Sequence, residues 1–182
     1  GLVELCVAEV TLTGRKTMGG IVGWNYYTYP DNTKGRVRAC VNKGDVSAAE
    51  GMAGGIAGSN YGEITDSVNT GAVSGGSSST RVGGIAGDSR GGGIVRCMSL
   101  GQVSGHSDVG GIVGISDRAS TVSDCAALGL AVRADSNAGR ITGPQTDGLL
   151  GRSFARADLS LTGGAVTEET AAQTGRDGES LS

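Results

Sequence analysis

The chain has 182 residues, a formal net charge of −3 and 35 glycines, but only one Trp, four Tyr and one Phe. Its Lys and Arg residues are scattered singly, so no basic stripe could neutralise phosphates, and nucleic acid is not an expected partner. No apolar run approaches the ~20 residues that span a bilayer, so membrane insertion is not expected. The glycine share is far above average usage, yet it lacks the triplet period and the proline content of collagen.

A glycine phrase returns along the chain at near-even spacing. It reads Gly-Gly-Ile-Val/Ala-Gly and starts at residues 19, 54, 83 and 110, with a degenerate copy, Gly-Arg-Ile-Thr-Gly, from residue 139. A fixed period of this kind is typical of stacked repeats, in which each copy buries its apolar side against its neighbours. The recurrence of Ile and Val at fixed phases also argues against a disordered chain. We therefore predict a solenoid, with its function on the surface.

A second phrase lies between the glycine copies. Blocks that begin at Gly35, Gly62 and Gly93 alternate apolar and polar residues, reach a Cys or Ser, and continue into Gly-x-Val. Three short strands in each period of about 28 residues predict an all-β, right-handed parallel β-helix of about five to six turns. Glycines are expected to supply the positive φ angles or tight bends at its corners.

One phase of the repeat holds small, weakly polar residues: Cys6, Cys40, Ser67, Cys97, Cys125 and Ser153. We predict an inward column of reduced thiols and hydroxyls, because free Cys is among the most buried residue types. Disulfides Cys6–Cys40 and Cys97–Cys125 are the alternative, which an extracellular setting permits. The side-by-side Cβ atoms of parallel neighbours do not favour such bridges. A zinc site is less favoured still, since no C-x-x-C pair accompanies them.

The pattern G-G-I-V/A-G, followed by G-x-I/V-x-x-C/S-x-N-x-G-x-V, resembles the GLUG repeat of bacterial surface proteins. That repeat occurs in adhesins and in large immunoglobulin-A-cleaving metallopeptidases, and the resemblance covers about residues 5 to 166. It implies a β-helix of the pectate-lyase-like kind, and it lends scaffold but no catalytic residues. The copy at Gly139 departs from the family pattern at Arg140.

The repeats define one domain. Residues 1–18 are expected to form a partial first turn, the repeats run from residue 19, and a final turn lies at about 151–166. The phrase from Ser153 to Leu161 looks like a last copy of the family turn. Residues 167–182 are polar and are predicted to be a tail or a linker to a following module.

No catalytic, metal or cofactor motif is evident. The H-E-x-x-H signature is absent, and the single histidine, His106, cannot supply two zinc ligands. β-Helices also host polysaccharide lyases and hydrolases, which need paired carboxylates. Asp66 and Asp124 share one phase two turns apart, but Arg96 occupies the turn between them, and a polar outward column explains these residues better. We therefore predict a non-enzymatic chain without cofactors, and a carbohydrate-active enzyme is the weaker alternative.

Residues 24 to 32 break the regular pattern. Trp24, Tyr26, Tyr27 and Tyr29 fall within six positions of the longest turn, and Tyr61 occupies a related loop in the next turn. Insertions on solenoids map to surface loops, and exposed Trp and Tyr are common contact residues for sugars and proteins. Two interpretations remain open: the rings pack on one another as a local mini-core, or they form a ligand-contact loop.

Together these features predict a non-catalytic extracellular module of a bacterial surface or secreted protein, within a longer multidomain chain. Its expected role is an adhesive or spacer unit, with host glycan or protein as candidate partners through Trp24, Tyr26, Tyr27, Tyr29 and Tyr61. The alternative is an accessory domain that positions substrate for a secreted metallopeptidase.

Overall fold

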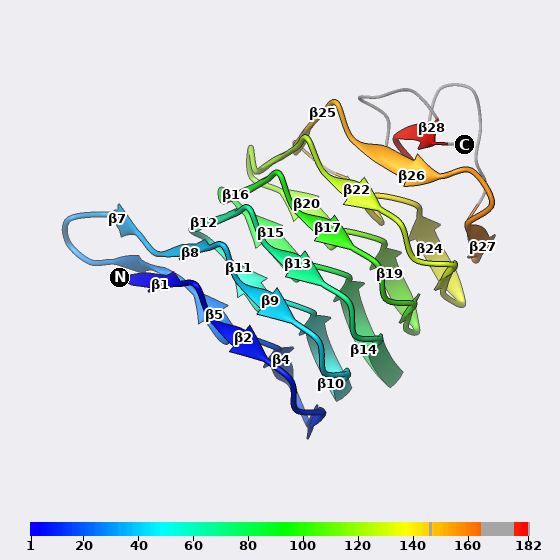
Figure 1. The fold of residues 1–182 in the computed structure, drawn as a ribbon, viewed down its shortest axis with the longest axis horizontal. Coiled ribbons are helices and arrows are strands. Elements are labelled where there is room, and N and C mark those ends of the chain that lie inside the picture. Colours follow the sequence, from blue (N-terminus) through cyan, green and yellow to red (C-terminus); the bar gives the residue numbers. More distant parts are fainter. Residues whose placement is uncertain (146, 165–176, 182) are drawn as a thin grey trace.

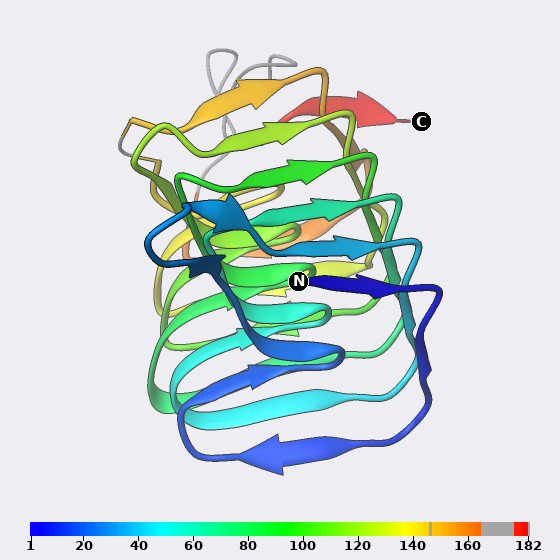
Figure 2. The same cartoon turned by 90° about the vertical axis from the view of Figure 1, so that its left-hand side faces the viewer.

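A computed structural model describes residues 1–145, 147–164 and 177–181. The strands stack turn upon turn, with the N-terminus at one end of the stack and the last described strand at the other (Figure 1). The first four turns pass through four parallel sheets in the same order (Figure 2). The predicted parallel β-helix is thus confirmed, with about five turns and with no helix among the described residues.

Sheets 1 and 2 form the first half of each turn. Sheet 1 contains, in stacking order, β1 (Leu2–Glu4), β8 (Arg36–Arg38), β12 (Glu63–Thr65), β16 (Gly93–Val95), β21 (Thr121–Ser123) and β25 (Leu149–Gly151). Sheet 2 contains β2 (Val7–Ala8), β9 (Val41–Asn42), β13 (Val68–Asn69), β17 (Met98–Ser99), β22 (Ala126–Ala127), β26 (Phe154–Arg156) and β28 (Glu179–Leu181).

Sheets 3 and 4 form the second half, and the glycine phrase connects them. Sheet 3 contains β3 (Leu12–Gly14), β4 (Thr17–Gly19), β10 (Val46–Gly54), β14 (Val73–Gly83), β18 (Val103–Ser104), β19 (Ser107–Gly110), β23 (Ala131–Arg133), β24 (Ser136–Gly139) and β27 (Ser160–Thr162). Sheet 4 contains β5 (Val22–Asn25), β11 (Ala57–Asn60), β15 (Ala86–Arg90) and β20 (Val113–Asp117). The phrase therefore separates two sheets, where the sequence had predicted three strands in each turn.

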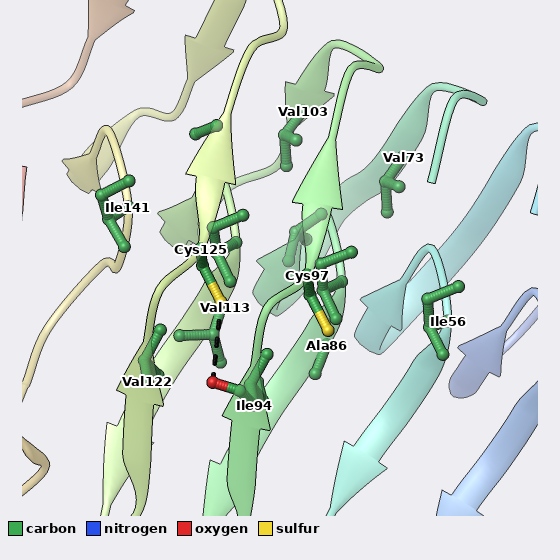
Figure 3. Close-up of a cluster of buried hydrophobic side chains, with 14 of the residues drawn as sticks. Ile56, Val73, Ala86, Ile94, Cys97, Val103, Val113, Val122, Cys125 and Ile141 are labelled. Atoms are coloured by element: carbon green, nitrogen blue, oxygen red, sulfur yellow. Dashed lines mark hydrogen bonds between the residues drawn. The ribbon is translucent and has the colours of Figure 1, made fainter. Parts of the chain in front are cut away.

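The core is a set of aliphatic columns that run along the stack (Figure 3). Ile56, Ile85, Ile112 and Ile141 of successive glycine phrases are fully buried. In sheet 1, Ile64 pairs with Val37 on one side and with Ile94 on the other. Each turn adds the same thin layer, and each such side chain contributes about 1.5–3 kcal/mol relative to an exposed one. Repetition of small aliphatic residues thus replaces the large rings that the composition lacks.

Buried asparagines form hydrogen bonds between successive turns. Asn42 and Asn69 are fully buried, and the Asn42 Nδ2 donates to Asn69 Oδ1 at 2.8 Å and to the carbonyl oxygen of Gly44 at 2.7 Å. Asn25 Nδ2 donates in the same way to Asn60 Oδ1 at 2.8 Å. A buried amide must find such partners because an unsatisfied polar group costs about 1–3 kcal/mol. The Asn-x-Gly part of the repeat is therefore a structural device.

The predicted Cys/Ser column exists, and its first member differs from the prediction. Cys40, Cys97 and Cys125 are buried, as are Ser67 and Ser153, and all four cysteines of the chain are free thiols. The Cys125 Sγ donates to the carbonyl oxygen of Ile94 in the preceding turn at 3.6 Å (Figure 3). Cys6 keeps the register of the column but is exposed, because the strand that follows it, β2, lies at the edge of sheet 2.

At the corner between sheets 1 and 2, a residue other than glycine adopts the left-handed backbone conformation in each successive turn. The residue before each Cys or Ser has a positive φ: Leu5, Ala39, Asp66, Arg96, Asp124 and Arg152. Such a conformation costs about 1–2 kcal/mol for a residue with a Cβ. The corner amides offset this cost by continuing the inter-turn ladder, as when Asp66 N donates to Val95 O at 3.1 Å. The expectation that glycines supply the corners therefore fails here.

Arg140 explains why the fifth glycine phrase is degenerate. It is 4% exposed, and its guanidinium donates to Gly178 O at 3.0 Å and to Ser180 Oγ at 2.9 Å, while its backbone N donates to Asp177 Oδ1. These residues flank and form β28, which pairs in parallel with β26. Residues 177–181 are thus bound to the stack and are not a free tail; of the remaining predicted tail or linker, 167–176 and 182 lie outside the described residues.

Candidate binding site at the aromatic cluster

The longest turn contains an antiparallel hairpin at the junction of sheets 4 and 1. Strand β6 (Tyr27–Thr28) pairs with β7 (Thr33–Lys34), so Tyr27 lies opposite Lys34 and Thr28 opposite Thr33. The hairpin extends beyond the outline of the other turns (Figure 1). The insertion predicted from the spacing is therefore a surface element added to the coil.

Four of the five aromatic candidates form one cluster. Tyr26 stacks on Tyr27 with ring centroids 4.4 Å apart and lies 4.8 Å from Tyr61, and Trp24 stacks on Tyr61 at 6.3 Å. Trp24 and Tyr26 are nevertheless 54% and 49% exposed. The rings therefore contact one another, as the mini-core interpretation requires, and still present about half of two rings to solvent.

Tyr29 does not join this cluster. It lies at the tip of the hairpin and is 90% exposed, and among the described residues it makes none of the ring contacts. It is thus the natural control residue for the cluster.

A cavity of about 280 Å³ adjoins the rings. It is lined by Tyr27, Asn32, Lys34, Tyr61, Arg90, Gly91 and Arg118. Arg90 Nη1 donates to the Tyr61 hydroxyl at 3.5 Å, and Lys34 Nζ donates to the Gly91 carbonyl at 3.0 Å. Aromatic faces and cationic groups therefore meet in one hollow formed by four successive turns.

The basic residues of this cavity were missed in the sequence. Arg90 and Arg118 could have been found from the repeat alignment at the end of sheet 4, where Asn60 pairs with Ser89 and Arg90 pairs with Asp117. Tyr61 and Arg90 thus occupy equivalent positions, and Arg118 follows one residue later in its turn. Continuing the repeat alignment past the glycine phrase would have aligned these residues.

Asp88 does not line the cavity but pairs with Arg90, which does. Its carboxylate is buried, and its Oδ2 lies 3.1 Å from Arg90 Nε and 3.5 Å from Arg81 Nη1. Burial raises the pKa of this carboxyl, and the Ser59 side chain and the two guanidinium groups oppose the rise. Asp88 therefore fixes the Arg90 side chain, whose Nη1 also contacts Tyr61.

The tyrosine hydroxyls of the cluster also interact. Tyr26 Oη donates to Tyr27 Oη at 3.4 Å, and this hydrogen bond is the main cause that raises the pKa of Tyr26. The charge of Arg118 acts on Tyr26 in the opposite direction, which places that guanidinium within electrostatic reach of the rings. The Tyr26 phenol is therefore a neutral hydrogen-bonding group near pH 7.

The acidic residues of the weaker enzyme interpretation are held in a charge ladder. Arg96 lies between Asp66 and Asp124, and it donates to both carboxylate oxygens of Asp66 at 2.6 and 2.9 Å. Arg152 Nη2 lies 2.8 Å from Asp124 Oδ1 in the next turn. The Arg96 hydrogen bond lowers the pKa of Asp66. The outward polar column that the sequence predicted is thus an exposed row of alternating ions.

The other polar groups that could suggest chemistry are likewise paired between turns. His106 Nδ1 lies 2.7 Å from Asp135 Oδ2, and Asn137 Nδ2 donates to Asp108 Oδ1 at 2.9 Å. In the described part of the chain, no group of three or more His, Cys, Asp or Glu is placed to hold a metal ion. A larger hollow of about 610 Å³ lies beside sheet 2, lined by Leu100, Leu128, Leu181 and residues 156–158. None of the predicted site residues lines it.

No family model matches this chain, and no curated protein matches it. Its structure is similar to that of a protein described as a "putative immunoglobulin A1 protease" from Bacteroides ovatus, with a TM-score of 0.74 and 24% sequence identity. The likeness covers 99% of this chain but only 66% of the other, so this chain spans less than two thirds of that protein. At this identity the likeness shows the fold alone, and membership of the GLUG repeat group stays a prediction.

Proposed function

We propose that this chain is a non-catalytic, extracellular binding module of a bacterial surface or secreted protein. Its role is that of an adhesive unit in a longer multidomain chain, with host glycan or protein as the partner. The observation that carries the proposal is the cluster of Trp24, Tyr26, Tyr27 and Tyr61. Trp24 and Tyr26 are about half exposed, and Tyr27 and Tyr61 line a cavity together with cationic side chains. Exposed aromatic anchors next to converging polar groups are common features of ligand sites.

The solenoid suits such a role because it is a rigid support. Its side chains inside the coil are aliphatic and buried, and its strands pair on both sides through most of the stack. Ligand contacts on a firm scaffold lose little entropy on binding. A pure spacer needs the same scaffold but gives no reason for a hairpin that exposes aromatic rings.

The test is binding to host glycans, mucins and matrix proteins by the wild type and by a Trp24→Ala/Tyr27→Ala variant. Tyr29→Ala is the matched control, because it removes an aromatic ring of the same hairpin outside the cluster. We expect the double variant to bind at least about tenfold more weakly, as loss of buried aromatic anchors does at interfaces. Circular dichroism checks that all three proteins are folded. Equal binding by the double variant and the wild type, or no binding by the wild type, rejects the site.

A second candidate function is an accessory domain that positions substrate for a secreted metallopeptidase. The structural likeness to the Bacteroides ovatus protein favours it, since that protein is described as a protease. The two functions share the binding step and differ in the parent chain. An H-E-x-x-H motif elsewhere in the parent supports the peptidase role, whereas further repeats and a surface anchor support the adhesin.

Carbohydrate cleavage by this chain is the least supported function. The acidic residues of this interpretation, Asp66 and Asp124, are both paired with arginines in the charge ladder. A general acid would need a raised pKa, and the pKa of Asp66 is lowered. Incubation with the glycans of the binding panel, followed by analysis for new reducing ends, tests this function directly.

A further inference from the structure

We propose that the ligand of the aromatic cluster is a carboxylate-bearing sugar. Its ring would lie against Tyr27 and Tyr61, and its carboxylate would be held by Lys34, Arg90 and Arg118. The inference rests on the binding function proposed above and specifies the chemical class of its ligand.

The charge of the cavity is the first observation. Its lining contains three cationic side chains, one amide, two phenols and one glycine, and no described carboxylate lines it. The chain as a whole carries a formal charge of −3, so this hollow has the opposite sign to the molecule. A concave site lined by cations concentrates the field there and favours an anionic ligand.

The placement of the cations is the second observation. Arg90 is held between Asp88 and Tyr61, at 3.1 and 3.5 Å, and its side chain is only 21% exposed. Arg118 is 69% exposed and lies 3.8 Å from its nearest carboxylate, Asp117, which is a weak pairing. One guanidinium is therefore preorganised and the other is available to a ligand. A guanidinium group matches a carboxylate through two parallel hydrogen bonds.

The aromatic faces distinguish a sugar from other anions. Tyr27 and Tyr61 line the same cavity as the cations, with ring centroids 6.3 Å apart in an edge-on arrangement. Ring faces of this kind pack on the apolar face of a pyranose while the phenols and Asn32 hydrogen-bond its hydroxyls. Nucleic acid needs a cationic groove that follows a backbone over several nucleotides, and three cations in one hollow do not make one.

The experiment measures binding of acidic oligosaccharides that contain sialate, glucuronate or galacturonate, each beside its own methyl ester. The ester keeps the sugar rings and removes the charge. We expect the acid to bind about tenfold or more tightly than the ester, as one charge-assisted hydrogen bond implies, and we expect added salt to weaken it. Lys34→Gln/Arg118→Gln should remove this preference, whereas Arg133→Gln, an exposed cation on β23, should leave it unchanged.

The outcomes separate the two proposals. Equal binding of acid and ester, abolished by Trp24→Ala/Tyr27→Ala, leaves the aromatic binding site and overturns the carboxylate inference. Failure of the wild type to bind any glycan overturns both, unless a host protein binds, in which case only the inference falls. A preference for the acid that survives Lys34→Gln/Arg118→Gln places the carboxylate elsewhere and overturns the inference, as does equally tight binding of a single-stranded oligonucleotide.

Discussion

The glycines of the first four phrases allow close approach between successive turns, and Gly84→Ala tests this. A Cβ at this position would overlap Ser99 Oγ and the carbonyl oxygen of Gly111, and would lie 2.7 Å from Ser99 Cβ. The Gly111 carbonyl belongs to the next turn. Ile85 N donates to Ile112 O of that turn at 2.8 Å, so the Gly111 carbonyl cannot move away without disturbing the hydrogen bonds between the two turns. Overpacking of a tight site costs about 1–3 kcal/mol, and because this clash involves backbone atoms we expect a loss of about 3 kcal/mol.

Gly93→Ala is the matched control. A Cβ at Gly93 would meet nothing within 4 Å, and this glycine does not have a positive φ. The same substitution should therefore stabilise the fold by about 0.4–1 kcal/mol, because alanine restricts the unfolded chain.

The assay is thermal unfolding followed by circular dichroism, with urea titration for the free energy. At roughly 2–4 °C per kcal/mol for a chain of this size, Gly84→Ala should melt about 6–12 °C below the wild type, while Gly93→Ala should melt at or slightly above it. A Gly84→Ala variant as stable as the wild type would refute the close-approach argument. So would a Gly93→Ala variant that loses as much stability as Gly84→Ala.

Three further predictions concern buried polar groups. In the native protein one thiol, Cys6, should react readily with a thiol reagent, and the three buried thiols should react only on unfolding. The pKa of Cys97 is raised, mainly by its contact with Cys125 and secondly by burial, which disfavours the reactive thiolate. Rapid modification of two or more thiols in the folded protein would contradict the buried column. Burial raises the pKa of Asp88, so the folded state binds this proton more readily than the unfolded state. The wild type should therefore gain stability relative to Asp88→Asn as the pH is lowered from neutral through the raised pKa, and a flat or falling difference in unfolding free energy would show that the assigned direction is wrong. Arg140→Ala should cost about 1.5–3 kcal/mol, the range for buried charged hydrogen bonds, and should expose the backbone amides of β28 to faster hydrogen exchange. Unchanged exchange at residues 179–181 would mean that Arg140 does not hold that strand.

The repeat itself made the fold predictable from the sequence. The glycine phrase fixes where one strand ends and the next begins, and Ile85 and its equivalents fix which side faces inward. Once each turn repeats the last, the parallel register follows, because only equivalent residues can form continuous apolar columns. The column of small residues from Cys40 to Ser153 was predictable for the same reason.

The left-handed corner could not be predicted from residue types. Asp66 and Arg96 adopt positive φ at positions where propensity would place glycine. What stabilises them is the hydrogen bond from each corner amide to the next turn, a contact between residues about thirty positions apart. The fate of Arg140 was hidden in a similar way, because its partners are Gly178 and Ser180, in a segment that carries no copy of the repeat.

The candidate site was half visible in the sequence. Aromatic residues crowded into one segment are conspicuous, and four of the five do come together. Arg90 and Arg118 are ordinary surface cations in the sequence, and only the stacking of successive turns brings them beside Tyr61. A solenoid thus assembles a site from equivalent positions of neighbouring turns, so a search along one segment finds only part of it.

Departures from a repeat need a cause, and the causes here differ. Arg140 replaces a glycine where its side chain binds the strand that closes the end of the stack, so its cause is structural. The hairpin has no such cause: the glycine phrase recurs after 27 to 29 residues in the other turns, and the longer spacing of 35 residues adds length that the coil does not need. Mutual packing of its rings accounts for their contacts but not for the exposed halves of Trp24 and Tyr26. Because exposed aromatic surface is unfavourable in water, these exposed halves, next to the cavity that Tyr27 and Tyr61 line, support the proposed binding site.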